Sequence, residues 1–360
     1  MIGRFALPLV AGRGAGLGNE LVPWARAFLA AQVGGARCLP PSFGLNARRY
    51  WRHFGTSRLD WIGHRALCAS LPRVHFGEED YLAHGGGDAV QALGRFVAAH
   101  RLAERPFWVL TTDGMWGGLR HIEAARDFAF TTLHASRFAA GNLVRIWQRI
   151  DPALPVVGLH VRMGDFGEPV SPGAYQGRFN ISLPPEWYQQ LALSIHEQMA
   201  GRVQFLIVSD APVDRLQFLA RGIRSVFTGD IPDSDCSDLL ALARCDLLVC
   251  AVSSYSVWAA FLSDAPYLWY GPNLTPHEGG WGSIWGHEAG QRRPGSPTRD
   301  ALAHAHAAGP GLPTRAWAVA ASGVVPFAAL EMARERHARR STDLVRYGVA
   351  RMPMHEELPV

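Results

Sequence analysis

The chain has 360 residues, of which 48% are hydrophobic and 18% are charged, values typical of a globular protein with a large core and two domains. The formal net charge is +4, no Lys is present, and no dense basic run carries interleaved aromatic residues, which argues against nucleic-acid binding. We find no eighteen-residue apolar run, no signal-peptide pattern and no zinc-finger or CxxC spacing among the five cysteines. We therefore expect a cytoplasmic protein with reduced, buried thiols and no transmembrane helix.

The N-terminal half alternates between segments with strand and helix patterns. A strand over 5–10 ("FALPLV") precedes a glycine-rich loop over 11–18 ("AGRGAGLG") and a helix over 19–33 ("NELVPWARAFLAAQV"). The segment 106–114 ("PFWVLTTDG") is a predicted strand that ends in a polar turn. Further predictions are loop and short helix over 35–60, a helix over 88–101, one long helix or two over 121–150, and an interdomain linker at 151–155 ("DPALP").

The C-terminal half alternates more regularly, which predicts a parallel sheet built from βαβ units. Predicted strands cover 156–161, 203–210, 223–229, 246–253 and 266–271, and predicted helices cover 184–200, 213–222, 233–245, 254–265 and 325–342. Residues 272–314 are rich in Gly, Pro and His and are expected to form a long loop. The expected domains are 1–150, 151–275, and a segment 276–360 that holds this loop and the last helix and can cross back to the N-terminal domain.

Four predicted strands of the second half end in polar residues. In an open parallel sheet, ligands bind at the carboxyl ends of the strands. The four strand ends are "HVRMGD" (160–165), "VSDAP" (208–212), "TGDIPDSD" (228–235) and "VSSYSVW" (252–258).

Arg162 directly follows a buried strand, where an unpaired charge would be costly. Asp165 can be its partner in a structural ion pair. Alternatively, Arg162 binds a diphosphate and Asp165 orients the guanidinium, whose planar fork suits phosphate. His160 either hydrogen-bonds a nucleotide or lies satisfied beside the sheet.

The run Ser253-Ser254-Tyr255-Ser256 joins a strand to a helix. Backbone N–H groups, hydroxyl groups and the helix dipole at such a junction can bind an anion. An ordinary serine N-cap is the simpler interpretation of the run alone. Together with Arg162 on a neighbouring strand end, the run favours a phosphate site.

These motifs resemble those of a known enzyme family. "HVRMGDF" is similar to the H-x-R-x-G-D signature of the α-1,2-fucosyltransferases of glycosyltransferase family 11, a motif shared with α-1,6- and protein O-fucosyltransferases. "GRGAGLGNEL", "FLIVSDAP" and "DLLALARCDLLVCAVSSYSVWAAFL" resemble the family's G-G-L-G-N-Q-L, F-x-x-F-S-D and D-L-x-x-M-x-x-C…N-S-T-F-S-W-W-x-A-x-L segments, in the same order, over residues 12 to 262. Met163 stands where the family commonly has a second Arg, and "GNEL" replaces G-N-Q-L.

The resemblance implies a GT-B glycosyltransferase, with two Rossmann-like α/β domains facing across a cleft, the N-terminal one on the acceptor side. The donor substrate would be GDP-fucose, with no cofactor and no metal. Arg162 would bind the β-phosphate, His160 would lie near the nucleotide, and Asp238 would contact the guanosine end. Ser253, Ser254, Tyr255 and Ser256 would bind phosphate oxygens, and the loop residues Gly16, Gly18 and Asn19 would approach a substrate.

The remaining candidates have competing interpretations. The acceptor needs a base for its hydroxyl proton, and Asp165, Glu168, Glu20 and Asp113 are the candidates. The glycine loop lacks the GxGxxG spacing of a dinucleotide site, so we expect a tight strand-to-helix turn in which Asn19 is the N-cap or a ligand contact. The "DSD" triplet at 233–235 lies at an expected helix start, where N-capping is favoured over metal binding. The tryptophans at 24, 51, 61, 116 and 258 can stack on sugars, but core packing is favoured for each.

The sequence thus predicts an inverting, metal-independent fucosyltransferase that acts on a surface glycan. Its partners would be a nucleotide-sugar donor and a glycan acceptor. A lipid-linked acceptor would bring it to the inner face of the membrane as a peripheral protein. The alternatives are a transferase for another nucleotide sugar, a non-catalytic nucleotide-sugar or glycan-binding protein of the same fold and, more distantly, a dehydrogenase.

Overall fold

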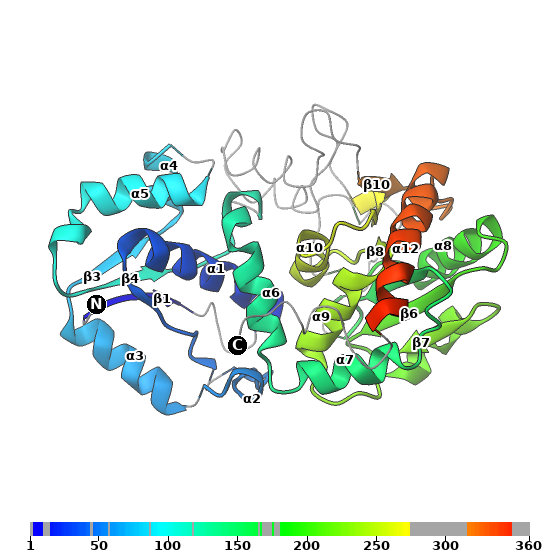
Figure 1. Ribbon diagram of the computed structural model, residues 1–360, viewed down its shortest axis with the longest axis horizontal. Coiled ribbons are helices and arrows are strands. Elements are labelled where there is room, and N and C mark those ends of the chain that lie inside the picture. The colour runs from blue at the N-terminus through cyan, green and yellow to red at the C-terminus, as the bar shows by residue number, and fades with distance from the viewer. Residues whose placement is uncertain are drawn as a thin grey trace. The chain divides into compact units, whose positions relative to one another are not determined.

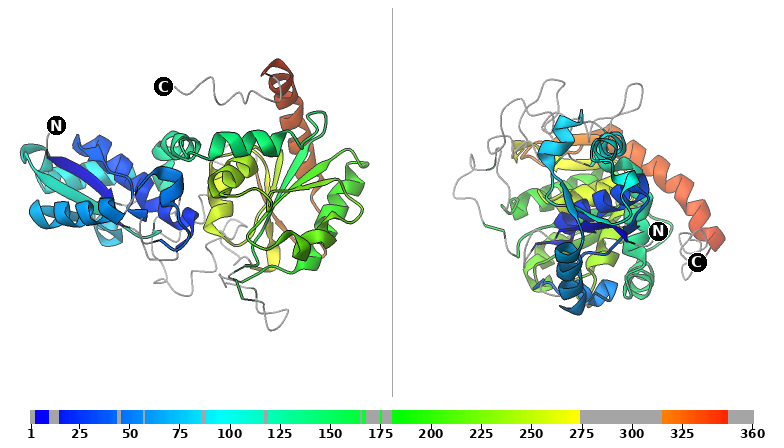
Figure 2. Two further views of the ribbon diagram at one scale, coloured as in Figure 1. Left: turned by 90° about the horizontal axis from the view of Figure 1, so that it is seen from below. Right: turned by 90° about the vertical axis from the view of Figure 1, so that its left-hand side faces the viewer.

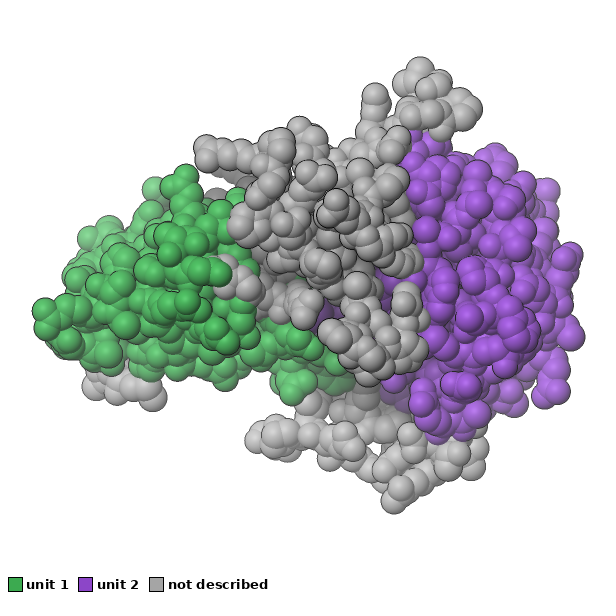
Figure 3. All heavy atoms as spheres, turned by 90° about the horizontal axis from the view of Figure 1, so that it is seen from above, with its two compact units in different colours: residues 1–137, 295–305 green, residues 138–294, 306–360 purple. Residues whose placement is uncertain are grey.

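The computed structural model describes residues 3–9, 15–43, 46–56, 58–85, 88–116, 119–164, 166, 167, 175, 181–273 and 315–347. The chain forms two compact units, one containing Met1–Arg137 and the other beginning at Phe138 (Figure 3). Each unit is an α/β structure built on an all-parallel sheet, as the alternating sequence pattern predicts. None of the described helices is both long and apolar enough to cross a membrane.

The first unit is built on a four-stranded parallel sheet with the order β2-β1-β4-β3 (Figure 1). Strand β4 is buried along its whole length, and the helix α1 packs on both β1 and β4. The strands are β1 (Arg4–Pro8), β2 (Arg37–Cys38), β3 (Arg73–Phe76) and β4 (Trp108–Thr112). The helices are α1 (Leu17–Gly34), α2 (Trp51–Phe54), α3 (Arg58–Ser70), α4 (Glu78–Ala83), α5 (Ala89–Ala99) and α6 (Arg126–His134), with 3-10 turns η2 (Leu102–Glu104) and η3 (Arg120–Ala125).

The second unit is built on a six-stranded parallel sheet with the order β10-β9-β8-β5-β6-β7. Helices lie on both faces of this sheet, with α8 on one face and α9 on the other (Figure 2). The strands are β5 (Val156–Val161), β6 (Gln204–Ser209), β7 (Ser225–Phe227), β8 (Leu247–Val249), β9 (Tyr267–Tyr270) and β10 (Ala316–Val319). The helices are α7 (Ala139–Trp147), α8 (Pro185–Gln198), α9 (Asp235–Arg244), α10 (Ser254–Phe261) and α12 (Phe327–Tyr347), with 3-10 turns η5 (Val213–Ala220) and η6 (Gly271–Asn273).

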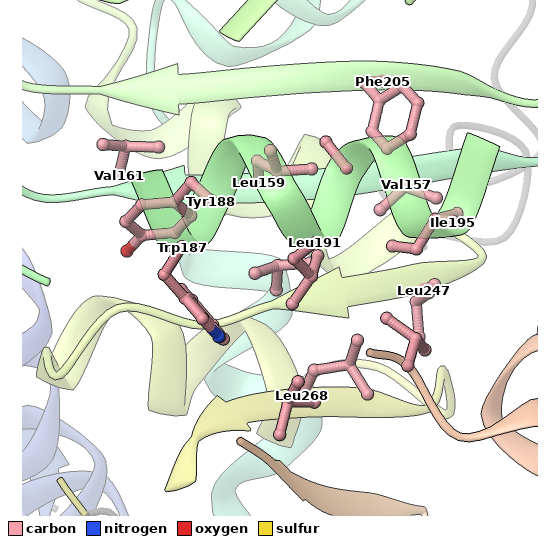
Figure 4. Packing of buried hydrophobic residues seen from close by; sticks show 14 of the residues in the cluster. Val157, Leu159, Val161, Trp187, Tyr188, Leu191, Ile195, Phe205, Leu247 and Leu268 are labelled. Carbon is pink, nitrogen blue, oxygen red and sulfur yellow. The ribbon is translucent and has the colours of Figure 1, made fainter. Parts of the chain in front are cut away.

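The apolar run that forms β5 is explained by the burial of both its faces. Val157, Leu159 and Val161 pack toward α8, whose Tyr188 and Leu191 belong to the same hydrophobic cluster (Figure 4). The opposite face of β5 packs against α9. The strand is thus covered on both faces, and its last residues carry their side chains at the carboxyl edge.

The division between the units differs from the expected one. It falls after Arg137 rather than at residue 150, because α7 packs on α9 and Asn142 donates its side-chain amide to the carbonyl oxygens of Pro232 (3.0 Å) and Asp233 (3.2 Å). The described part of the C-terminal segment, residues 315–347, belongs to the second unit, where β10 pairs with β9. The helix expected over 325–342 is confirmed as α12.

Several elements were not predicted from the sequence. Strand β3 and the helices α3 and α4 lie in the stretch 58–83, and the sequence analysis made no prediction for residues 61–87. The helix expected over 213–222 is a 3-10 helix. The region 121–150, expected to form one long helix or two, is divided into the 3-10 turn η3 and the helices α6 and α7.

Candidate phosphate-binding site of the second unit

All four polar strand ends lie at one edge of the second sheet, since β7, which residues 228–235 follow, pairs in parallel with β6. Strand β5 pairs with β6 on one side and with β8 on the other, all in parallel. Residues 160–164, 208–212 and 252–258 therefore lie at or just after the ends of neighbouring strands at the carboxyl edge. This is the edge at which open parallel sheets bind ligands.

Arg162 forms an ion pair with Asp210, the first residue after β6. Arg162 Nη1 lies 3.0 Å from Asp210 Oδ2, and only 16% and 21% of the two side chains are exposed. The Arg162 guanidinium also lies over the Phe166 ring, 5.0 Å from its centroid. The sequence analysis proposed Asp165 as the partner; Asp165 lies outside the described residues, and the described ion pair is made with Asp210.

Asp210 also holds the turn that follows β5. Its Oδ1 accepts the Met163 amide hydrogen at 2.9 Å, and a Cβ on Gly164 would lie 2.5 Å from its Oδ2, so the close approach requires glycine. Burial raises the pKa of Asp210, but the amides of Met163 and Gly164 and the charge of Arg162 outweigh it, and the pKa is below its usual value. The carboxylate is therefore ionised at neutral pH and fixes Arg162.

Met163 stands where the motif that "HVRMGDF" resembles commonly has a second Arg, and its side chain packs against the hydrophobic cluster around β5. Met163 therefore adds an apolar contact to the core and no charge to the carboxyl edge of the sheet. A single arginine, Arg162, supplies the positive charge of this turn.

His160 joins the end of β5 to the start of α10. Its Nδ1 lies 2.6 Å from Ser256 Oγ, which also accepts the Ala251 amide hydrogen at 3.0 Å. Tyr188 from α8 donates its hydroxyl to the His160 carbonyl oxygen at 3.0 Å. The histidine is thus held in place by three elements of the unit.

The imidazole of His160 is neutral at physiological pH. The side chain is 4% exposed, and its pKa is lowered to about 3, chiefly by burial. The charge of Arg162 also lowers this pKa, and the Asp210 carboxylate acts in the opposite direction. Its ring lies 5.0 Å from that of Tyr255. A neutral histidine next to an arginine can accept or donate a hydrogen bond without adding charge.

The Ser-rich segment caps the helix α10. Ser253 is the N-cap residue, and its Oγ accepts the Tyr255 amide hydrogen at 3.2 Å, as the capping interpretation predicts. Tyr255 donates its hydroxyl to the carbonyl oxygen of Asp235, the first residue of α9. The positive end of the α10 dipole therefore lies beside His160, two residues from Arg162, so capping and an anion site are compatible here.

Asp238 lies in the first turn of α9 and is enclosed. It is 6% exposed, its Oδ2 accepts the Ser234 hydroxyl at 2.7 Å, and its Oδ1 is buried without a hydrogen bond among the described residues. Burial raises its pKa to about 7, although the hydroxyls of Ser234 and Thr228 act in the opposite direction. The expected contact with a guanosine stays a prediction. The "DSD" triplet does lie at the start of α9, as expected.

The candidates in the first unit lie at the start of α1 and directly after the end of β4. Gly16 is the N-cap of α1, and Asn19 lies in the first helical turn. The N-cap alternative for Asn19 is therefore wrong, and the ligand contact stays a prediction. Gly18 is also inside the helix and is buried, as is Glu20. Asp113 directly follows β4 and is half-exposed, with its Oδ1 3.5 Å from Nε2 of His75, a residue the sequence analysis missed.

Two groups of candidates remain. Asp165, Glu168 and most of the 272–314 loop lie outside the described residues. Trp24, Trp116 and Trp258 are buried, as core packing predicts, whereas Trp51 is 43% exposed.

Several solved structures align with this chain, among them those of the following three proteins. POFUT1 in complex with GDP-fucose is 14% identical and aligns over 75% of this chain and 98% of its own, with a TM-score of 0.45. The fucosyltransferase NodZ from Bradyrhizobium is 14% identical over 73% and 94%, with a TM-score of 0.42. The glycosyl transferase family 9 protein from Veillonella parvula is 10% identical over 94% and 98%, with a TM-score of 0.40. No protein-family model and no curated protein matches the chain.

Proposed function

We propose that the protein is an inverting glycosyltransferase that moves fucose from GDP-fucose to a hydroxyl of a glycan acceptor. In this proposal the two α/β units form a GT-B enzyme, and the carboxyl edge of the second sheet holds the diphosphate. The observation that carries the proposal is the arrangement of Arg162, fixed by Asp210, beside the N-terminus of α10.

The arrangement suits a departing diphosphate. When the sugar C1–O bond breaks, negative charge grows on the β-phosphate oxygen, and fixed donors that face this charge lower the barrier. A guanidinium has five N–H donors, so Arg162 can hold Asp210 and a phosphate together. The N-terminus of α10 adds a positive dipole. These groups supply charge stabilisation without requiring a metal.

His160 and Asp210 have supporting roles in this proposal. Neutral His160 leaves the positive charge of the site to Arg162 and the helix dipole, and its Nδ1 bond to Ser256 fixes the first turn of α10. Asp210 fixes the backbone of 163–164 as well as the guanidinium. Preorganised donors of this kind need no rearrangement as the charge develops.

The test compares Arg162→Ala and Arg162→Lys with wild-type protein. We expect the Ala variant to lose at least about 100-fold in kcat/KM for GDP-fucose while GDP affinity falls much less, because the phosphate charge is greatest in the transition state. Lys keeps the charge but not the planar fork, so it should restore only part of the rate.

Two rival functions predict different results. A non-catalytic nucleotide-sugar-binding protein would lose affinity in Arg162→Ala and show no turnover in any form. A transferase for another nucleotide sugar would retain the Arg162 dependence but with a UDP-sugar or another GDP-sugar as its donor. The acceptor in our proposal is a surface glycan, and a lipid-linked one would place the enzyme at the inner face of the membrane.

A further inference from the structure

The helix α3 of the first unit carries an apolar stripe on its solvent side (Figure 1). Leu59, Ile62, Ala66 and Ala69 recur at the spacing of one helical face, and all four are exposed. The exposed fractions of Leu59 and Ile62 are 76% and 55%. The side chains of α3 that are partly buried in the unit lie on the other side of the helix, and they include Trp61, His64, Leu67 and Cys68. The helix therefore has one apolar face toward the unit and a second toward solvent.

Packing inside the unit does not account for this second face. Residues 59–70 are all described, and none of their side chains is fully buried. The nearby helix α5, in contrast, buries Leu93 and Phe96 completely. Helices of this length gain most of their stability by packing an apolar face against another surface. An apolar medium that covers the outer face of α3 would supply the contacts that the unit itself leaves out.

The segment around α3 carries a strong positive charge. Residues 46–76 contain six arginines and a single acidic residue, Asp60, which gives a formal charge of +5 against +4 for the whole chain. Arg49, Arg65 and Arg73 are exposed. Arg65 follows Ile62 by three positions and so lies beside the apolar stripe, with its guanidinium 4.9 Å from the centroid of the Trp61 ring. The partner of this face must therefore be both apolar and anionic.

A membrane surface with anionic lipids meets both requirements. Lipid phosphates attract arginine side chains, and the boundary between headgroups and acyl chains takes up exposed aliphatic side chains of an interfacial helix. A second copy of the chain, docked face to face, would bring the same arginines together, which like-charge repulsion opposes. A nucleic-acid backbone would pair with the arginines but leave Leu59 and Ile62 in water.

We propose that the outer face of α3 binds the surface of a membrane that contains anionic lipids. Leu59 and Ile62 would insert at the boundary between headgroups and acyl chains, and the arginines of 46–76 would contact lipid phosphates. The protein would lie on the membrane without crossing it. A lipid-linked acceptor in the same membrane would then meet the enzyme at its surface. This role rests on the glycosyltransferase function proposed above, whereas the membrane binding itself does not.

The experiment is vesicle flotation of the full chain. Vesicles of phosphatidylcholine alone are compared with vesicles that also contain about 30% phosphatidylglycerol, an anionic lipid. We expect wild-type protein to bind the anionic vesicles and to be released as added salt shortens the range of the charge attraction. The double variant Leu59→Ser with Ile62→Ser should bind at least about tenfold more weakly, because it loses both inserted side chains.

The matched control is the double variant Val324→Ser with Phe327→Ser. These two residues belong to the second unit, where they are 65% and 62% exposed, so the control removes as much exposed apolar surface from a different place. It should bind anionic vesicles as wild type does. The Tm of each variant, measured in parallel, checks that the fold is retained.

Two single variants test the charge and the apolar stripe separately. Arg65→Gln should lower the partition onto anionic vesicles about fivefold, the usual scale for one arginine at such a surface. Ala66→Leu extends the stripe between Leu59 and Ile62 and should raise the partition at least about threefold. A gain of binding of this kind cannot come from a folding defect.

The inference is overturned if wild-type protein does not bind the anionic vesicles, or if the Leu59→Ser, Ile62→Ser variant binds them as well as wild type. Single-stranded RNA that binds wild type and this variant equally, with no vesicle binding, would assign the arginines to nucleic acid instead. Nucleotide binding is measured separately by thermal shift with GDP. Vesicle binding without a GDP shift would keep the membrane surface and contradict the proposed function, and a GDP shift without vesicle binding would do the reverse.

Discussion

Arg162 and Asp210 pair across two adjacent parallel strands, with Arg162 Nη1 3.0 Å from Asp210 Oδ2. They are 48 positions apart in sequence, and each directly follows the end of its strand. Because both strands are buried and in register, the pair is set by the sheet itself. The Asp210 carboxylate pairs with the charge of Arg162, which explains how a charged side chain can directly follow a buried strand. It also positions the guanidinium for an anionic ligand.

Gly164→Ala tests how closely the turn must approach Asp210. The new Cβ would lie 2.5 Å from Oδ2 and 2.8 Å from Cγ of Asp210, so the carboxylate must move away from Arg162. We expect a loss of about 1–3 kcal/mol in unfolding free energy, measured by urea denaturation, together with loss of nucleotide-sugar turnover.

Gly141→Ala is the matched control in the same unit. Gly141 lies inside α7, and no atom outside its own helical turn lies within 4 Å of the position that a methyl group would take. Alanine there should leave activity intact and stabilise the helix by about 0.5–1 kcal/mol. Equal behaviour of the two variants would contradict the role of Gly164.

Asp238→Asn tests the buried carboxyl of α9. The pKa of Asp238 is raised by burial to about 7, so the folded state binds the proton more tightly than the unfolded chain does. Its stabilising contribution is complete below the unfolded pKa near 3.8 and is lost as the pH rises to about 7. Relative to wild type, the Asn variant should therefore gain up to about 4 kcal/mol between pH 4 and pH 9, measured by urea denaturation at each pH.

Asp235→Asn controls for removing one negative charge from the same turn of α9. If the stability difference between Asp238→Asn and wild type stays constant from pH 4 to pH 9, the pKa of Asp238 is not raised in the folded state.

His160→Asn tests the neutral histidine at the end of β5. Burial lowers the pKa of His160 to about 3, so the unfolded chain takes up the proton first as the pH falls below 6.5. The stability that this histidine contributes is present above pH 6.5 and is lost progressively toward pH 3. Wild type should therefore lose about 2–3 kcal/mol of its advantage over the variant between pH 8 and pH 4.5 in urea denaturation. An advantage that is equal at both pH values would contradict a buried neutral imidazole.

The sequence analysis was most successful where burial makes a strand apolar. The run 156–161 is confirmed as β5, and the polar residues at 160–164, 208–212 and 252–258 do lie on neighbouring strand ends. The partner of Arg162 was missed because the pairing depends on which strands are adjacent, and strand order cannot be read from a single chain. The sequence "VSD" (208–210), in which Asp210 directly follows the end of β6, was the available signal.

His75 was missed for a different reason. Strand β3 has four residues, of which only Phe76 is fully buried, so it lacks the apolar run that reveals a core strand. The imidazole contacts Thr111 and Asp113, which are 36 and 38 positions later in sequence. These contacts form only when β3 pairs with β4. Short edge strands of this kind carry little pattern of their own.

The most direct test of the central claim is a thermal-shift comparison of wild type and Arg162→Ala with GDP, GDP-fucose, GDP-mannose, UDP-glucose and NAD. A ligand present at about 100 times its dissociation constant stabilises the native state by about 2.7 kcal/mol. Our account predicts a clear upward shift of the wild-type Tm with GDP and GDP-fucose, and a smaller shift in Arg162→Ala. No shift with any nucleotide, or shifts of equal size in the two proteins, would contradict a diphosphate site at Arg162 and leave its pairing with Asp210 as a structural ion pair.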